Sequence, residues 1–241
     1  MDRYVVLFAR EPARQAHEKG LRSPAAEALF REFARGWTEA ADLAGARLVL
    51  AAPREDRAAW ARSLAGVAGV AWLAQRGPSL GTRLEDAVRR IAALGGHAVV
   101  VGGDVPPAST LLREAFEGLE AGMDAAISPA PDGGVSLLAM RSADADLLRG
   151  IRPRRRTVRR DLLRALLARG RRVRLLPPAT DVDGRASLRR LVRGEALPVF
   201  LVLLARRALQ AVLAIPAGCS RVFSPLVLHG SPSLRGPPIS A

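Results

Sequence analysis

Three short segments place carboxylates where they could hold a cation. "VVVGGDVPP" puts Asp104 two glycines after a run of β-branched residues, and "TDVDG" puts Asp181 and Asp183 between a predicted strand and a predicted helix. "SPAPDGGV" puts Asp132 on a glycine-rich turn. Carboxylate oxygens suit Mg²⁺, and a magnesium ion bound to phosphate needs only one or two of them from the protein. Asp104 and Asp183 would supply that number.

The backbone around Asp104 favours close approach of a ligand. Gly102 and Gly103 remove the Cβ atoms before the carboxylate, and Pro106 and Pro107 fix the path of the chain after it. In an open α/β sheet, ligands bind beyond the carboxyl ends of the strands, where Asp104 is expected. From this stretch alone, two interpretations are equally good: a metal ligand, or a cap for the turn or for the helix near Ser109.

Apolar runs alternate with segments of helical period along most of the chain. The runs predict strands at residues 4–9, 46–52, 70–75, 97–103, 124–130, 135–140 and 172–177. One helical segment begins at Ser23 as N-cap and runs through Trp37, and others cover residues 54–64, 80–94, 109–120 and 158–169. This rhythm predicts a three-layer α/β/α domain with a mostly parallel sheet. The Pro-Asp-Gly-Gly turn joins two strands without a helix, so we expect a local antiparallel excursion there.

Several other kinds of site are disfavoured by pattern. No Gly-x-Gly-x-x-Gly follows the first strand, and the chain has no Gly-x-x-x-x-Gly-Lys phosphate loop. His17, His97 and His229 lack zinc spacing and have no cysteine partners. No serine occupies a nucleophile elbow.

The charge is strongly positive but unevenly distributed. The 241 residues are 49% hydrophobic with a formal net charge of +14, which is typical of a globular chain with an excess of arginine. Twelve arginines and a single acid lie between Arg149 and Arg174, and the rest of the chain is close to neutral. This segment is interpreted as a solvated face, with a phosphate-bearing ligand as the alternative and nucleic acid disfavoured.

The ends of the chain suggest its organisation and location. We expect one α/β domain at residues 1–195, an amphipathic helix at 196–215 and a disordered tail at 216–241. Arg206 and Arg207 interrupt the apolar run of that helix, which barely reaches the roughly 20 residues that a bilayer span requires. We expect this helix to dock on the domain, with a membrane-surface or dimer helix as the alternative. The single cysteine and the absence of a signal peptide predict a cytoplasmic protein.

From about Tyr4 to Arg193 the chain resembles bacterial proteins of the nucleotide-diphospho-sugar transferase (GT-A) fold, often described as glycosyltransferases of arsenosugar biosynthesis. Five segments carry the resemblance in the family's order: "VVLFAREP", "PSLGTRLEDA", "VVVGGDVP", "SPAPDGGVSLLAM" and "DVDGRASLRRL". The chain departs from the family in the loop after the first strand, "PARQAHEKGL", where Gln15 replaces a phosphate-binding glycine.

The resemblance implies roles for particular residues. Asp104 and Asp183 would bind Mg²⁺ or Mn²⁺, and Asp181 would orient Asp183 or its loop. If the reaction inverts the sugar, a carboxylate must deprotonate the acceptor hydroxyl, and Asp132 is the candidate base. A further set would bind the nucleotide or substrate: Arg10, Lys19, Arg83, Gly103, Gly133 and Gly134.

The function expected from these features is a metal-dependent glycosyltransferase that uses a nucleotide sugar and a small-molecule acceptor. One alternative is a nucleotidyltransferase that joins a nucleoside monophosphate from CTP or GTP to a phosphorylated acceptor. Another is a degenerate, non-catalytic member that binds a partner or an anionic surface through its arginines. The sequence leaves the oligomeric state open.

Overall fold

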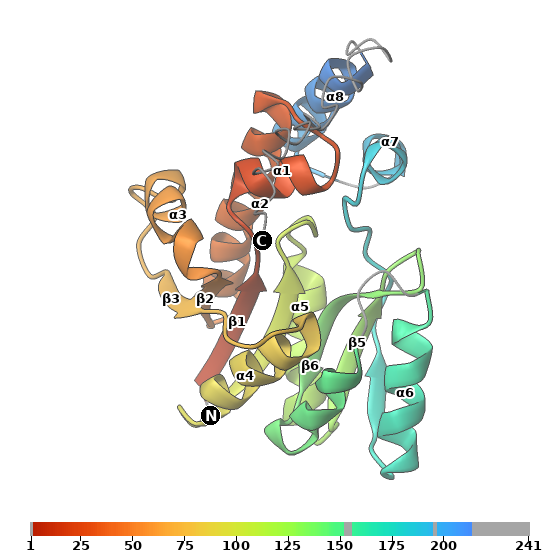
Figure 1. Ribbon diagram of the computed structural model, residues 1–241. Helices are drawn as coiled ribbons and strands as arrows, with labels where there is room; N and C mark the ends of the chain where they lie inside the picture. Colours follow the sequence, from red (N-terminus) through yellow and green to blue (C-terminus); the bar gives the residue numbers. More distant parts are fainter. Residues whose placement is uncertain (1, 152–155, 195–196, 214–241) are drawn as a thin grey trace, which may run out of the picture.

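The computed structural model describes residues 2–151, 156–194 and 197–213, and its centre is a single seven-stranded sheet (Figure 1). The strands are β1 (Asp2–Phe8), β2 (Arg47–Ala52), β3 (Ala71–Ala74), β4 (Gly96–Gly102), β5 (Ala125–Pro129), β6 (Val135–Met140) and β7 (Val173–Leu175). They lie in the order β3-β2-β1-β4-β6-β5-β7. β6 is antiparallel to both of its neighbours, and every other neighbouring pair is parallel. The predicted mostly parallel, mixed sheet is therefore confirmed.

Helices cover both faces of the sheet. They are α1 (Pro12–Glu18), α2 (Pro24–Leu43), α3 (Arg57–Ser63), α4 (Leu80–Ala92), α5 (Ser109–Glu120), α6 (Val158–Ala168), α7 (Arg185–Gly194) and α8 (Val199–Leu213), with 3₁₀ segments η1 (Arg54–Asp56) and η2 (Ser142–Gly150). Side chains alternate along each strand, so Val5 and Leu7 pack with α2, α3 and α5. Tyr4 and Val6 pack on the opposite face with α4, η2 and α6.

A third apolar cluster joins four helices beyond one edge of the sheet. The N-terminal half of α2 supplies Phe30 and Phe33, whose rings meet edge to face with centroids 6.1 Å apart. Leu191 of α7 and Leu201 of α8 belong to the same cluster, as does Leu21 after α1. These helices lie together at the top of Figure 1. Val182, just before α7, and Val212, near the end of α8, are both buried in this cluster, so it holds both helices against α2.

The structure corrects several element boundaries. The segment expected to be an altered phosphate loop contains α1, and the helix expected over residues 54–64 divides into η1 and α3. The predicted C-terminal helix at 196–215 is α8, Val199–Leu213. The tail predicted at 216–241 lies outside the described residues. The division into a domain and a terminal helix stays a prediction.

The polarity of the sheet brings distant loops to one edge. β4, β5 and β7 are parallel, so the residues after them emerge on the same side, and the turn before antiparallel β6 joins them there. The connecting segment 176–184 is fixed to this edge by two buried serines. The Ser128 hydroxyl donates to the Pro177 carbonyl at 2.6 Å, and the Ser136 hydroxyl donates to the Ala179 carbonyl at 2.6 Å.

Replacing Ser136 by alanine should loosen this attachment. Ser136 is buried, so Ser136→Ala leaves the Ala179 carbonyl without its donor and should lower the free energy of unfolding by about 1–3 kcal/mol. Urea unfolding of the purified variant measures the change. Ser109→Ala is the control, because Ser109 is exposed, and it should stay within about 0.5 kcal/mol. Equal stability of the two variants would contradict the anchoring role.

Candidate functional site

Asp104 is positioned by the close approach of β1 and β4. The Gly103 amide donates to the Phe8 carbonyl at 3.1 Å, which continues the parallel pairing one residue past the strand. A Cβ on Gly103 would lie 2.5 Å from the Ala9 Cβ and 3.0 Å from the Gln15 Oε1, so only glycine fits there. In this structure Gly103 therefore serves the packing that places Asp104 at the sheet edge.

Asp183 is held beside Asp104 by its own loop. The Val182 amide donates to the Asp104 carbonyl at 2.9 Å, which joins the two loops through their backbones. The Ser187 hydroxyl accepts from the amides of Asp183 and Gly184 at 2.8 and 3.0 Å and thereby fixes the start of α7. Two acids from distant parts of the chain thus occupy neighbouring positions.

The ammonium group of Lys19 lies between these two carboxylates. Lys19 follows the last residue of α1, and its Nζ donates to the Asp104 Oδ2 at 2.5 Å and to the Asp183 Oδ1. Two oxygens on one nitrogen are at most about 6 Å apart, twice a hydrogen-bond length. Burial opposes the charge of Lys19, but the attraction of Asp104 and Asp183 outweighs it and raises the pKa of the ammonium above its ordinary value.

Asp132, Asp181 and Asp183 form a cluster of carboxylates next to this bridge. Each offers an oxygen, and these oxygens all lie within 4.8 Å of one another. Burial, together with the charges of Asp183 and Asp104, raises the pKa of Asp181 to about 7. Burial and the neighbouring carboxylates therefore favour the protonated form of Asp181.

Asp132 lies on a tight turn whose glycines are structurally required. The Asp132 Oδ1 accepts from the Gly134 amide at 2.8 Å, which closes the turn. Gly133 has φ +93°, and a Cβ there would lie 2.1 Å from the Arg156 carbonyl oxygen. The Arg159 amide donates to the Gly133 carbonyl at 3.2 Å. The start of α6, with its arginines, therefore abuts the turn that carries Asp132.

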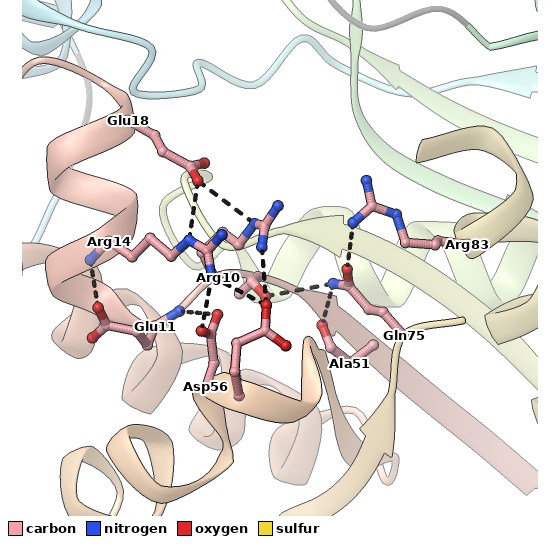
Figure 2. A network of polar contacts seen from close by, with 10 residues as sticks. Arg10, Glu11, Arg14, Glu18, Ala51, Asp56, Gln75 and Arg83 are labelled. Atoms are coloured by element: carbon pink, nitrogen blue, oxygen red, sulfur yellow. Dashed lines mark hydrogen bonds and ion pairs between the residues drawn. The ribbon is translucent and has the colours of Figure 1, made fainter. Parts of the chain in front are cut away.

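Arg10 and Arg83 lie in a separate polar network where β1 and β3 end (Figure 2). The Arg10 guanidinium is 3.8 Å from the Glu18 carboxylate and 4.0 Å from that of Glu55. The Arg83 Nη1 donates to the Gln75 Oε1 at 3.4 Å. Burial first, and then repulsion from Arg10, lower the pKa of Arg83. Because the two cations repel each other, an anion that contacts both would be stabilised.

The same network fixes the direction of α1. The buried Asp56 accepts from the Glu11 amide at 3.0 Å, and the Glu11 carboxylate accepts from the amides of Ala13 and Arg14 at the start of the helix. Figure 2 shows the side chains of Arg14 and Glu18, from α1, close to that of Arg10, which precedes the helix. α1 thereby connects the arginine network at its start with the carboxylates that Lys19 contacts at its end.

The structure brings together part of the predicted site and separates the rest. Asp104, Asp132, Asp181 and Asp183 meet at one edge with Lys19, whereas Arg10 and Arg83 lie in the neighbouring network. Gly103, Gly133 and Gly134 shape the loops that carry the acids.

The sequence patterns above do not predict α1, nor the contribution of Glu11 and Asp56. The signals for this helix were present. Glu11 is a side-chain N-cap followed by Pro12 at the first helical position, and Gly20 adopts φ +67° just past the end.

The chain is similar to one protein family and to several solved structures. Residues 37–153 match the model of a family described as "Uncharacterized protein conserved in bacteria (DUF2064)". The match covers a little less than half of the chain, and over these residues the chain is similar to that family. No curated protein matches the chain.

Solved structures share the fold along most of its length. A candidate nucleotide-diphospho-sugar transferase from Desulfovibrio desulfuricans G20 is 24% identical over 88% of this chain and 97% of its own, with a TM-score of 0.73. CMP:2-keto-3-deoxy-manno-octonic acid synthetase in complex with CTP is 13% identical over 86% of this chain and 100% of its own, with a TM-score of 0.53. Rv0371C from Mycobacterium tuberculosis H37Rv in complex with manganese is 19% identical over 81% and 100%, with a TM-score of 0.50. The fold is that of nucleotide-diphospho-sugar transferases and nucleotidyltransferases.

The titration of Asp181 should appear in the pH dependence of stability. The folded protein holds a proton on Asp181 up to about pH 7, whereas an unfolded aspartate loses it near pH 4, so stability should fall as the pH rises through this window. Asp181→Asn should remove this contribution. The difference in unfolding free energy between wild type and variant should change by about 1–2 kcal/mol between pH 5 and pH 8, after allowance for solvent screening.

Urea unfolding with EDTA present measures this difference. The control is Asp42→Asn, since Asp42 is an exposed residue near the end of α2. A difference between wild type and Asp181→Asn that does not change with pH would show that Asp181 is ionised in the folded protein throughout the range.

Proposed function

We propose that this protein is a metal-dependent transferase that moves a sugar from a nucleotide-diphospho-sugar donor to a small-molecule acceptor. The observation that carries the proposal is the convergence of Asp104 and Asp183 on a single cation, the Lys19 ammonium, at the edge of the sheet where ligands bind in such folds. The fold itself is shared with transferases of this type.

The donor set fits a hard divalent cation, Mg²⁺ or Mn²⁺. Asp104 and Asp183 would hold it, because their oxygens already contact one positively charged atom, and Asp181 would orient Asp183 through the contact between their side chains. Manganese in the related mycobacterial structure supports this choice. Such a cation would neutralise charge on the diphosphate leaving group.

Lys19 and a divalent cation would compete for the same two oxygens. The lysine side chain is long and flexible, so its ammonium can leave the carboxylates and contact a phosphate of the donor. In this proposal Lys19 keeps the acidic edge partly neutral before ligands bind, and its helix α1 stays anchored by Glu11 and Asp56.

The remaining roles follow from chemistry and position. Arg10 and Arg83 would contact donor phosphates, since the repulsion between their guanidinium groups is relieved by an anion. In a reaction that inverts the sugar, Asp132 would take the proton of the acceptor hydroxyl. The hydroxyl oxygen then bonds to the anomeric carbon while the bond from that carbon to the phosphate oxygen breaks. Gly133 and Gly134 would hold Asp132 in place.

A second candidate is transfer of a nucleotide rather than a sugar. The likeness to a CMP-sugar synthetase solved with CTP favours it. In that reaction a phosphorylated acceptor attacks the α-phosphorus of the nucleotide and pyrophosphate leaves. The arginines of α6, which adjoin the Asp132 turn, would hold the acceptor phosphate.

One assay separates these functions and tests the role of Asp104. The full chain is incubated with Mn²⁺ and a panel of UDP- and GDP-sugars, CTP and GTP, and release of nucleoside diphosphate or pyrophosphate is measured. Release of nucleoside diphosphate supports the first proposal, and release of pyrophosphate supports the second.

Asp104→Ala should lower either rate at least about a hundredfold, because several kcal/mol of charge stabilisation are lost. Asp42→Ala is the control; a similar rate in both variants would remove Asp104 from the site.

The competition between Lys19 and the cation has a separate test. Lys19→Met should bind Mn²⁺ at least about fivefold more tightly than wild type, because the competing positive charge is gone. Calorimetric titration measures the affinity without turnover. Arg14→Met neutralises another cation of α1, one that contacts Glu18 and Glu55 instead, and should leave it unchanged. Weaker Mn²⁺ binding in Lys19→Met would show that Lys19 supports the metal site.

A further inference from the structure

The outward face of α8 carries an unusual amount of apolar surface. Eight large apolar side chains are exposed among the described residues, and four of them lie on this helix. Val199 is 76% exposed, Phe200 52%, Leu203 50% and Leu213 52%. The opposite face contains Leu201, Ala205, Ala208 and Val212, which are buried in the cluster with α2 and α7. Both faces of α8 are therefore apolar, although only one of them is covered by the described chain.

Exposed arginines lie on α8 and on α7, which contacts α8. α7 exposes Arg185, Arg189, Arg190 and Arg193, while its Leu188 and Leu191 point into the core. α8 exposes Arg206 and Arg207 on the same side as its exposed apolar residues, because helical period places positions 199, 203, 206, 207 and 210 on one stripe. Neither helix contains an acidic residue.

These six arginines lack partners within the described chain. None of them forms an ion pair or hydrogen bond with any other described side chain. Elsewhere in the protein, arginines such as Arg3, Arg149 and Arg169 bind carboxylates. The outward surface of α7 and α8, called here the α7–α8 surface, thus combines unpaired positive charge with exposed apolar side chains.

We propose that the α7–α8 surface docks on an anionic lipid bilayer. Helices that lie in the membrane interface present apolar side chains to the acyl boundary and cationic side chains to the headgroup phosphates. No helix in the described part of the chain is long and apolar enough to cross a membrane, so the association is peripheral. Four aliphatic or aromatic side chains beside the arginines favour lipid over nucleic acid, which is bound chiefly through charge. This inference goes beyond the proposed function and does not depend on it.

The test is flotation of the full chain with vesicles. Vesicles of phosphatidylcholine alone are compared with vesicles that also contain phosphatidylglycerol. The protein should float with the anionic vesicles and remain free with the neutral ones, and added salt should release it because the attraction is screened. No binding to anionic vesicles at low salt would overturn the proposal.

Two variants locate the binding surface. Phe200→Ser/Leu203→Ser removes apolar contact, and Arg189→Glu/Arg190→Glu reverses charge; each should weaken vesicle binding at least about tenfold. All four side chains are exposed, so circular dichroism should show an unchanged fold. Matched controls alter exposed residues elsewhere: Leu43→Ser/Leu94→Ser for the apolar change and Arg57→Glu/Arg62→Glu for the charge change.

Three results would overturn the inference. Equal loss of binding in a variant and its matched control would show that binding is not specific to the α7–α8 surface. Undiminished binding by Phe200→Ser/Leu203→Ser would leave the apolar side chains without a role. In the third result, the wild type binds no vesicles and is a dimer by light scattering, and Phe200→Ser/Leu203→Ser is a monomer. This result would show that the surface binds a second copy of the chain.

Discussion

Four aspartates share the edge of one sheet with a single ammonium group, and the repulsion among them governs how this region is built. Asp132, Asp181 and Asp183 have oxygens within 4.8 Å of one another, and Asp104 reaches the same place through Lys19. Like charges at such spacing in a partly buried position are costly unless a cation or a proton compensates. Here both occur, because Lys19 bridges two of the acids and the pKa of Asp181 rises to about 7. A site with this excess of oxygen ligands is chemically suited to a divalent cation.

The rest of the structure holds these groups together against their repulsion. Parallel strands β4, β5 and β7 send their following loops to one edge, and antiparallel β6 returns the Asp132 turn to it. Ser128 and Ser136 fix the segment that carries Asp181 and Asp183. On the other side, Asp56 and Glu11 hold the start of α1 so that Lys19 ends above Asp104. The positions of the charged groups are therefore set by the backbone, which is held by hydrogen-bonded polar side chains.

The helices α7 and α8 carry a surface that differs in chemistry from the acidic site. Their inner faces close the third apolar cluster, and their outer faces carry arginines and exposed apolar side chains. A soluble surface normally separates its apolar residues with charges of both signs. This surface has charge of one sign only among the described residues, which gives it affinity for an extended anionic surface. The acidic edge and the α7–α8 surface thus have opposite charge within a short length of chain.

The sequence alone determined the fold class and the candidate acids. Alternating strand and helix patterns fix a layered α/β domain because side-chain period is a local property, and the Pro-Asp-Gly-Gly turn marks the antiparallel strand. Asp104 and Asp132 could be chosen because glycines flank them after predicted strands.

Only the tertiary structure decided which charges meet. Lys19 contacts acids 85 and 164 positions away, and Arg10 approaches Arg83, because the sheet order places their elements side by side. The exposure of Phe200 and Leu203 could not be predicted either. The sequence of an apolar helix does not show which of its faces the rest of the chain covers.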